Sequence, residues 1–258
     1  MLPIHIISLE SSTARRDLCV GMMGAAGLPF SFFDAVDGRS LSAQAKSHIY
    51  DETANCERFK RPLSPSEIGC YLSHLKLWEH IAEGRTPAAL VLEDDAQLDA
   101  GFKTFLEQIR NYDLEDVYLK LDGASETLDL EDSSNTKMTL GLRKVIHAPQ
   151  IAHRTTGYII GARAAQKMIA NRPKFFRPVD IDIKHYWEHG VPVWTVIPQL
   201  VHEARSKGDE STIETSRRNL KGNNPLWRFW KNTTYQYNYL KERKQNPLVA
   251  SRLIPEEN

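Results

Sequence analysis

A capped helix followed at once by a short apolar strand constrains the fold of this chain more than any other feature. Ser64 is a typical N-cap residue, a proline occupies the first helical position, and Glu67 can complete a capping box. These signals predict a helix over residues 65–83, with Gly84 as its C-cap. Residues 88–92 are all aliphatic and predict a buried strand. A helix and a strand joined this closely indicate an α/β unit.

The same alternation of strand and helix continues along the chain. Further strands are predicted over residues 4–9, 116–121, 157–161 and 191–197, and further helices over residues 101–109 and 162–170. Such alternation is typical of an α/β fold in which helices flank a mostly parallel central sheet on both faces. Residues 122–137 are acidic and polar without a clear period, so we expect a mobile surface loop there.

Length and local charge suggest one main domain with a tail. A chain of 258 residues can bury one substantial core, and we predict a domain over residues 1–215 and a tail over residues 216–258. Between residues 216 and 244, eight Lys or Arg residues stand against one Glu, a local net charge of +7, and aromatic residues are interleaved with them. The tail either associates with acceptor or membrane or packs its aromatic residues onto the core.

The overall composition excludes some classes of protein and partner. The formal net charge is zero, so no whole-protein field favours nucleic acid as a partner. Residues 1–10 contain neither the basic region nor the long apolar run of a signal peptide, and we expect a cytoplasmic protein. Three cysteines at irregular spacing are too few for a disulfide framework or a zinc site, and we expect them to be reduced, with Cys70 in the core.

Three adjacent carboxylates, Glu93, Asp94 and Asp95, follow the strand predicted over residues 88–92. A buried strand places them at its carboxyl end, where open α/β sheets usually bind ligands. Like charges at this spacing repel one another unless a cation lies among them, and oxygen ligands favour Mg²⁺ or Mn²⁺. Such an ion can bridge the phosphates of a nucleotide sugar. The alternative is a solvated acidic turn.

Asp180 and Asp182 form a second pair of carboxylates, separated by one residue. In an extended segment both would face one side, and either could be the general base that takes a proton from an acceptor hydroxyl. The alternative is a helix N-terminus with acidic residues in its first turn, because Pro178 precedes the pair.

Several isolated polar residues are weaker candidates. His202 follows the last predicted strand and could bind the metal, although a lone histidine is more often structural. Ser73 and His74 lie within the helix over 65–83 and either contact the donor or make satisfied hydrogen bonds in the core. Candidate phosphate or base contacts, which could equally be surface residues, are Arg15, Arg16 and Lys76.

At these residues the chain resembles glycosyltransferase family 25, the bacterial lipooligosaccharide galactosyltransferases whose distant relatives include procollagen galactosyltransferases. The matching segments are Ile6-Ile7-Ser8-Leu9 followed by Arg15-Arg16, then 33–38 (FDAVDG), 63–74 (LSPSEIGCYLSH), 91–96 (VLEDDA), and 157–160 (GYII) with Ala164-Ala165. Several ordered motifs at such spacing are far more specific than any one of them. The resemblance implies a GT-A-like fold, a UDP-sugar donor, a divalent metal, and an inverting transfer that makes a β-linkage.

The resemblance also assigns roles to particular residues. It implies that Asp95 binds the metal, with Glu93 as the alternative second ligand, and that Asp94 lies nearest the ribose. It further implies that Ser8, Leu9 and Asp37 form the wall facing the nucleotide, and Ser73-His74 matches the family's helix motif. Asp182 or Asp180 is the best candidate for the base by analogy and by chemistry.

The function expected from the sequence is transfer of a hexose, galactose from UDP-galactose first of all, to a lipooligosaccharide or related surface glycan. UDP-glucose or UDP-N-acetylhexosamine would need the same chemistry, and a catalytically silent glycan- or nucleotide-binding domain is a different class of protein. A lipid-linked acceptor assembled on the inner face of the inner membrane would suit a basic, aromatic tail that contacts the membrane peripherally.

Overall fold

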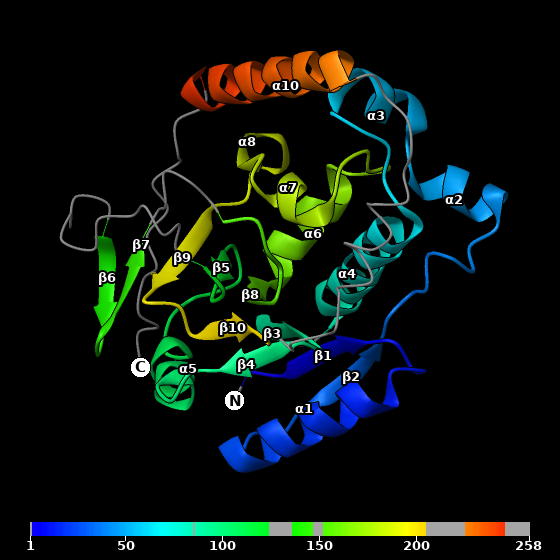
Figure 1. Ribbon diagram of the computed structural model, residues 1–258. Helices are drawn as coiled ribbons and strands as arrows, with labels where there is room; N and C mark the ends of the chain where they lie inside the picture. The colour runs from blue at the N-terminus through cyan, green and yellow to red at the C-terminus, as the bar shows by residue number, and fades with distance from the viewer. Residues whose placement is uncertain (1, 85, 124–135, 147–151, 205–224, 246–258) are drawn as a thin grey trace.

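The computed structural model describes residues 2–84, 86–123, 136–146, 152–204 and 225–245. Its centre is an eight-stranded sheet in the order β2-β1-β3-β8-β5-β9-β7-β6 (Figure 1). The strands are β1 (Ile4–Ser8), β2 (Ser31–Asp34), β3 (Ala88–Glu93), β5 (Tyr118–Lys120), β6 (Thr136–Leu140), β7 (Arg143–Ile146), β8 (Gly157–Gly161) and β9 (Val193–Ile197). A separate antiparallel pair joins β4 (Ala96–Leu98) to β10 (Val201–Glu203).

The central sheet is mixed, but most of its strands share one direction. Strands β8 and β7 run antiparallel to their neighbours, and the other six point the same way. This confirms an α/β fold with a mostly parallel central sheet flanked by helices. The parallel pairing of β1 with β2 and β3 brings the carboxyl ends of three strands to one edge, as an open α/β sheet requires for a ligand crevice.

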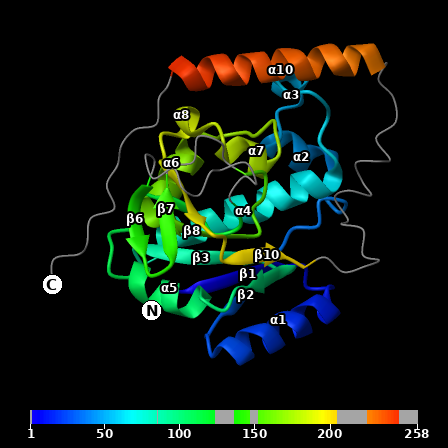
Figure 2. The same ribbon diagram turned by 60° about the vertical axis from the view of Figure 1, so that its left-hand side comes forward.

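Helices cover both faces of the sheet, and each face has its own core. The helices are α1 (Thr13–Ala26), α2 (Ala43–Ile49), α3 (Glu52–Arg58), α4 (Pro65–Glu83), α5 (Phe102–Ile109), α6 (Ala162–Ala170), α7 (Val179–Ile183), α8 (Tyr186–His189) and α10 (Pro225–Gln245). Along β3 the side chains alternate, so that Ala89 and Val91 face the core under α4 and α6, whereas Leu90 and Leu92 face the core under α1 and α5. Figure 2 shows these two layers on opposite sides of the sheet.

Helix α4 begins where the sequence predicts. The Ser64 hydroxyl accepts a hydrogen bond from the backbone N–H of Glu67, and the Glu67 carboxylate accepts one from the N–H of Ser64, which completes the capping box. The turn from β8 into α6 also falls at the predicted residues, because Gly161 ends the strand and serves as the N-cap of the helix.

Residues 179–183 and 122–137 differ in how well local sequence patterns predict their structure. Of the two readings left open for residues 179–183, the helix is the one observed, as the short α7. Of the mobile surface loop predicted over residues 122–137, residues 124–135 lie outside the described residues. The prediction is wrong at both ends, because Asp122 is buried and pairs with Lys120, and Thr136 begins β6. No helix in the described part of the chain is long and apolar enough to cross a membrane.

Candidate donor and metal site

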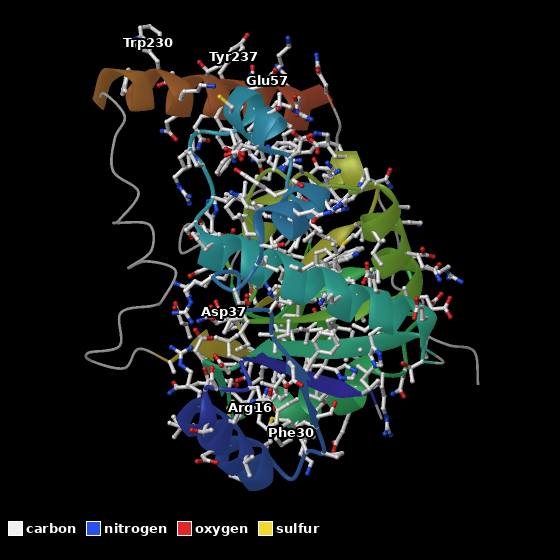
Figure 3. All side chains as sticks on the ribbon, turned by 90° about the vertical axis from the view of Figure 1, so that its right-hand side faces the viewer. Arg16, Phe30, Asp37, Glu57, Trp230 and Tyr237 are labelled. Carbon is white, nitrogen blue, oxygen red and sulfur yellow. The ribbon has the colours of Figure 1, made fainter. Side chains whose placement is uncertain are left out.

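The candidate site lies where β1 and β3 end side by side. Ile7 of β1 is in register with Glu93 at the end of β3, so Ser8 and the loop of Asp94 and Asp95 leave the sheet at the same edge. In Figure 3, which looks at the molecule from this side, Asp37 and Arg16 are labelled near that edge. The structure therefore brings the acidic cluster and most of the predicted donor-facing residues to one region.

Asp94 joins three elements at this edge. Its Oδ2 accepts a hydrogen bond from the Ser8 hydroxyl at 2.8 Å, and its Oδ1 accepts one from the Arg15 guanidinium at 3.0 Å. The carboxylate is only 14% exposed. Arg16 donates from the next position of α1 to the Ser8 carbonyl at 2.9 Å and also pairs with Asp34. The charge of Asp94 is thus balanced locally by Arg15.

Glu93 is held by a chain of buried aromatic and imidazole groups. The Trp78 indole donates to the Tyr158 hydroxyl at 2.9 Å, and that hydroxyl lies 2.8 Å from Nδ1 of His74. The phenolic hydrogen can then bond to Nδ1, which leaves the Nε2–H of His74 to donate to Glu93 at 3.2 Å. Thr155 also donates to Glu93. Burial raises the pKa of Glu93, but the hydrogen bonds from His74 and Thr155 outweigh it and lower the pKa overall.

Asp95 has the opposite environment. Its Oδ1 is buried and has no hydrogen-bond partner among the described residues. Burial, followed by the charges of Glu93, Glu203 and Asp94, raises the pKa of Asp95 to about 7. Glu203, which the sequence analysis missed, lies on β10 opposite Ala96, and only the pairing of β10 with β4 brings it there. A bound cation would stabilise the charged form of a carboxylate so placed.

The described residues contain one group of three potential ligand atoms that all lie within 4.8 Å of one another, formed by Cys70, His74 and Glu93. The predicted set of Glu93, Asp95 and His202 shares Glu93 with this group. His202 lies on β10 opposite Gln97, and its Nδ1 is 2.6 Å from the Gln199 side chain. The structure therefore places His202 on the strand beside the acidic loop without bringing it into a preformed ligand cluster within that part of the chain.

We call residues 35–38, which follow β2 and pack tightly against α4, the wall loop. Ser73 donates to the Gly69 carbonyl at 2.7 Å and accepts from the Val36 N–H at 2.8 Å, so this buried hydroxyl holds the loop that carries Asp37. The backbones meet at two glycines, since a Cβ at Gly69 would lie 2.5 Å from the Gly38 nitrogen. The buried Ser73 hydroxyl thus fixes the position of the wall loop through contacts in the core.

Two residues predicted to face the donor are Asp37, on this loop, and Leu9, directly after β1. The Asp37 carboxylate forms an exposed ion pair with Arg39, and hydrogen bonds from Arg39 lower its pKa. Leu9 follows β1 directly and is half-buried, with its carbonyl accepting from the Ser12 N–H at 2.9 Å. Lys76, the weakest of the basic candidates, is exposed on α4.

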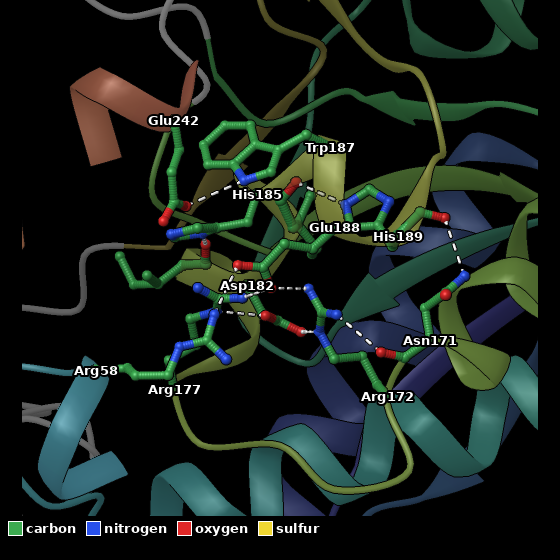
Figure 4. Close-up of polar contacts among 12 residues, drawn as sticks. Arg58, Asn171, Arg172, Arg177, Asp182, His185, Trp187, Glu188, His189 and Glu242 are labelled. Carbon is green, nitrogen blue, oxygen red and sulfur yellow. Dashed lines mark hydrogen bonds and ion pairs between the residues drawn. The ribbon is translucent and has the colours of Figure 1, made fainter. Parts of the chain in front are cut away.

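Asp182 lies in a buried network of charges (Figure 4). It accepts hydrogen bonds from Arg172 at 2.8 Å, from Arg177 at 2.5 Å and from the Tyr71 hydroxyl at 2.5 Å. Glu188 pairs with the same two arginines. Burial raises the pKa of Asp182, but the two guanidinium groups outweigh it and hold the pKa far below its usual range. A general base needs a higher proton affinity than this, so these contacts favour a structural role.

Asp180, the other member of the pair, has a different position. It is only partly buried, and its charge raises the pKa of Cys70 together with the charges of Glu93 and Asp95, with burial as the largest cause. The charges of Asp180 and of the acidic cluster therefore both act on the Cys70 thiol. The three cysteines are unpaired, and Cys70 is partly buried.

A family model described as glycosyltransferase family 25 (LPS biosynthesis protein) matches residues 1–183. This is more than half of the chain, and the chain belongs to glycosyltransferase family 25. The matched range contains every predicted site residue except His202.

Relatives occur in bacteria and animals. The chain is 29% identical to the lacto-N-neotetraose biosynthesis glycosyltransferase LgtE of Neisseria gonorrhoeae, over 76% of this chain and 72% of that protein. It is 28% identical to a glycosyltransferase 25 family member of Aedes aegypti and 26% identical to procollagen galactosyltransferase 1-A of Xenopus laevis, in each case over 81% of this chain. The chain spans only 37% of the length of each of these two animal proteins.

Among solved structures, a crystal structure of galactosyltransferase LgtC with donor and acceptor sugar analogs is similar at a TM-score of 0.42 and 13% identity. The similarity covers 88% of this chain and 99% of that chain.

Proposed function

We propose that this chain is a metal-dependent, inverting hexosyltransferase that transfers galactose from UDP-galactose to a lipooligosaccharide or related surface glycan and makes a β-linkage. Membership of glycosyltransferase family 25 supports the class, and the names of the bacterial and frog relatives support a glycan acceptor and galactose as the sugar. UDP-glucose and UDP-N-acetylhexosamine are the competing donors.

The observation that carries the proposal is the buried Oδ1 of Asp95, which has no hydrogen-bond partner among the described residues. Burial and the charges of Glu93, Glu203 and Asp94 oppose the ionisation of this carboxylate, and a bound cation would offset that cost. Asp95 and Glu93 would hold Mn²⁺ or Mg²⁺, with His202 as a further candidate on β10. When bound, this ion would offset the charge on the diphosphate leaving group.

The chain's own residues would bind and orient the donor around this point. Arg15 and Ser8 fix Asp94, which would then present a rigid acceptor to a ribose hydroxyl. The wall of Leu9 and Asp37 would lie against the nucleotide. His74, locked by Tyr158, would keep the Glu93 carboxylate ionised and oriented.

For the general base we favour Asp180 over Asp182. Asp180 is partly exposed, and its charge acts on the same thiol as the charges of the acidic cluster, whereas the carboxylate of Asp182 is occupied by two arginines and a tyrosine. Asp180→Asn should therefore lower kcat by about a hundredfold or more with the fold intact. Asp182→Asn should instead destabilise the protein by about 3 kcal/mol, because two buried guanidinium groups lose one of their two carboxylate partners. Comparable melting temperatures for both variants would contradict this assignment.

Acceptor-dependent release of UDP tests the function. Wild type, Asp95→Asn and the control Asp116→Asn would be assayed with each UDP-sugar, with Mn²⁺ or EDTA, and with truncated glycolipid acceptors. Asp116 is an exposed carboxylate paired with Arg163 and Lys167, away from the site. We expect turnover with UDP-galactose that both EDTA and Asp95→Asn abolish and that Asp116→Asn retains. Metal-independent turnover would remove the proposed role of the acidic cluster, and UDP binding without turnover for any acceptor would favour the silent binding domain.

A further inference from the structure

Helix α10 lies across one end of the molecule and has two very different sides (Figures 1 and 2). Its inner side contacts α3 and α8. The ring of Tyr235 lies 5.6 Å from that of Phe59, the ring of Tyr239 lies 5.2 Å from that of His185, and Glu242 accepts a hydrogen bond from the Trp187 indole at 3.2 Å. These contacts fix the rotation of the helix about its own axis.

The outer side of α10 is apolar and exposed. It presents Phe229, Trp230, Tyr237 and Leu240, with exposed fractions of 64%, 66%, 66% and 51%. Positions 229, 233, 237, 240 and 244 fall on one face of an α-helix, and Trp230 adjoins them. In Figure 3, Trp230 and Tyr237 project from α10 away from the rest of the protein. Only three other large apolar side chains in the described residues are exposed, so this face concentrates the apolar surface.

Basic residues accompany this apolar face. Lys241 and Lys244 are exposed next to Leu240, and α10 as a whole contains five Lys or Arg residues against one Glu. The resulting net charge of +4 is far from the neutral balance of the whole chain. Aromatic side chains that are flanked by lysines along a helix lying on the surface are the pattern of an interfacial membrane-binding helix.

We propose that the outer face of α10 binds the surface of an anionic lipid bilayer. Phe229, Trp230, Tyr237 and Leu240 would enter the interface between headgroups and acyl chains, and Lys241 and Lys244 would contact lipid phosphates. The helix would lie flat on the bilayer, because its inner side is already committed to the protein by Tyr235, Tyr239 and Glu242.

A second copy of the chain fits this surface less well. Two copies joined through α10 would bring Lys241 and Lys244 of each to a contact without a carboxylate from either α10, because the one acidic residue of this helix, Glu242, lies on its inner side. One helix face with four apolar side chains is also small against the roughly 800 Å² that each partner buries in a stable protein interface. An anionic lipid bilayer can pair its phosphates with the lysines and bury the apolar side chains at the same time.

Vesicle sedimentation with the full chain tests this proposal. Wild type would be mixed with vesicles of phosphatidylcholine alone and with vesicles that also contain phosphatidylglycerol, without donor or acceptor, so that the result does not depend on transferase activity. We expect binding to the mixed vesicles that weakens as salt is added. Lys241→Gln/Lys244→Gln should lower the affinity about tenfold or more, at roughly 1 kcal/mol for each lysine near an anionic surface.

The apolar face has a matched control elsewhere on the protein. Phe229→Ser/Tyr237→Ser should weaken binding by about tenfold or more for each aromatic ring removed. Leu18→Ser/Val20→Ser removes two apolar residues of comparable exposure, 73% and 52%, from α1 and should leave binding unchanged. Absence of wild-type binding, or equal loss in the α1 control, would overturn the proposal. So would dimerisation of wild type, seen by analytical ultracentrifugation, that the α10 variant alone abolishes.

Discussion

At the scale of single residues, the three carboxylates after β3 show how neighbouring groups of one charge acquire different properties. Glu93 is ionised because His74 and Thr155 donate to it, and Asp94 is balanced by Arg15. Asp95 receives no such partner within the described chain, and its pKa rises to about 7. The difference comes from the elements that surround each residue, since the three are adjacent in sequence.

The unfavourable position of Asp95 predicts that its removal stabilises the metal-free protein. Because the pKa of Asp95 in the folded state is raised above its unfolded value, the protein loses stability as the pH rises from about 4 to about 7. Above this range Asp95→Asn should increase the free energy of unfolding by about 2 kcal/mol, allowing for partial exposure. Mn²⁺ should raise the melting temperature of wild type and not of the variant. Thermal unfolding with and without Mn²⁺ checks both effects, and a variant less stable than wild type without metal would refute the argument.

His189 predicts a second dependence on pH, with the opposite sign. Its Nδ1 accepts from the Val191 N–H at 3.2 Å and its Nε2–H donates to the Ile183 carbonyl at 3.1 Å, so the buried ring is neutral. Burial lowers its pKa to about 4. A depressed pKa gives stability that is present above the unfolded value of about 6.5 and is lost as the pH falls toward 4.

The loss of unfolding free energy caused by His189 should reach about 3 kcal/mol near pH 4. Urea unfolding of wild type and His189→Gln across the range measures it. The variant should be less stable near neutral pH but should lose less stability on acidification. Parallel curves for the two proteins would show that His189 does not titrate in this way.

At the scale of elements, local signals predicted well where they were complete. The capping box fixed the start of α4, and the aliphatic run fixed β3, because both depend on residues close in sequence. The short α7 remained open, since the alternation of acids and aliphatics over 179–183 suits a strand as well as a helix. What decides it is the network of Arg172, Arg177 and Tyr71 around Asp182, which is assembled by the tertiary fold.

Contact between α4 and the wall loop predicts a strong effect from a small substitution. A Cβ at Gly69 would lie within 2.5 Å of both the Gly38 nitrogen and the Val36 carbonyl oxygen, so Gly69→Ala must push the loop away. Ala in a helix interior is otherwise favoured over Gly by about 1 kcal/mol. The matched control is Gly24→Ala in α1, where nothing lies within 4 Å of the new Cβ.

We expect Gly24→Ala to raise the free energy of unfolding by about 0.5–1 kcal/mol and Gly69→Ala to lower it by about 1–3 kcal/mol. Gly69→Ala should also weaken UDP binding, because the displaced loop carries Asp37. Chemical denaturation and calorimetric titration with UDP measure the two effects. Equal stability and equal UDP affinity of the two variants would mean that displacing the wall loop affects neither property.

At the scale of the whole molecule, the site could be predicted only in part. The acidic cluster and its place at the end of β3 follow from sequence, as does the carboxyl edge of a mostly parallel sheet. Glu203 and Thr155 could not be found, because strand pairing and the approach to β8 bring them in from distant segments. Nor could the sequence tell which side of the aromatic C-terminal segment faces solvent, since that depends on the contacts of Tyr235 and Tyr239.

The two sides of α10 predict that its attachment to the body can be loosened without disturbing the donor site. Tyr239 is 9% exposed on the inner side, whereas Tyr237 is 66% exposed on the outer side of the same helix. Tyr239→Ala removes ring contacts with His185 and Trp187 and should cost about 2–4 kcal/mol of local stability. Tyr237→Ala should cost less than about 0.5 kcal/mol.

Hydrogen–deuterium exchange measured by peptide would separate these effects in space. Tyr239→Ala should speed exchange in α10 and in α8 beneath it, while β1, β3 and the start of α4 keep the protection of wild type. Tyr237→Ala should match wild type everywhere. Faster exchange in β1 and β3 after Tyr239→Ala would mean that α10 and the donor site unfold as one cooperative unit. A substitution that loosens α10 would then also destabilise the donor site.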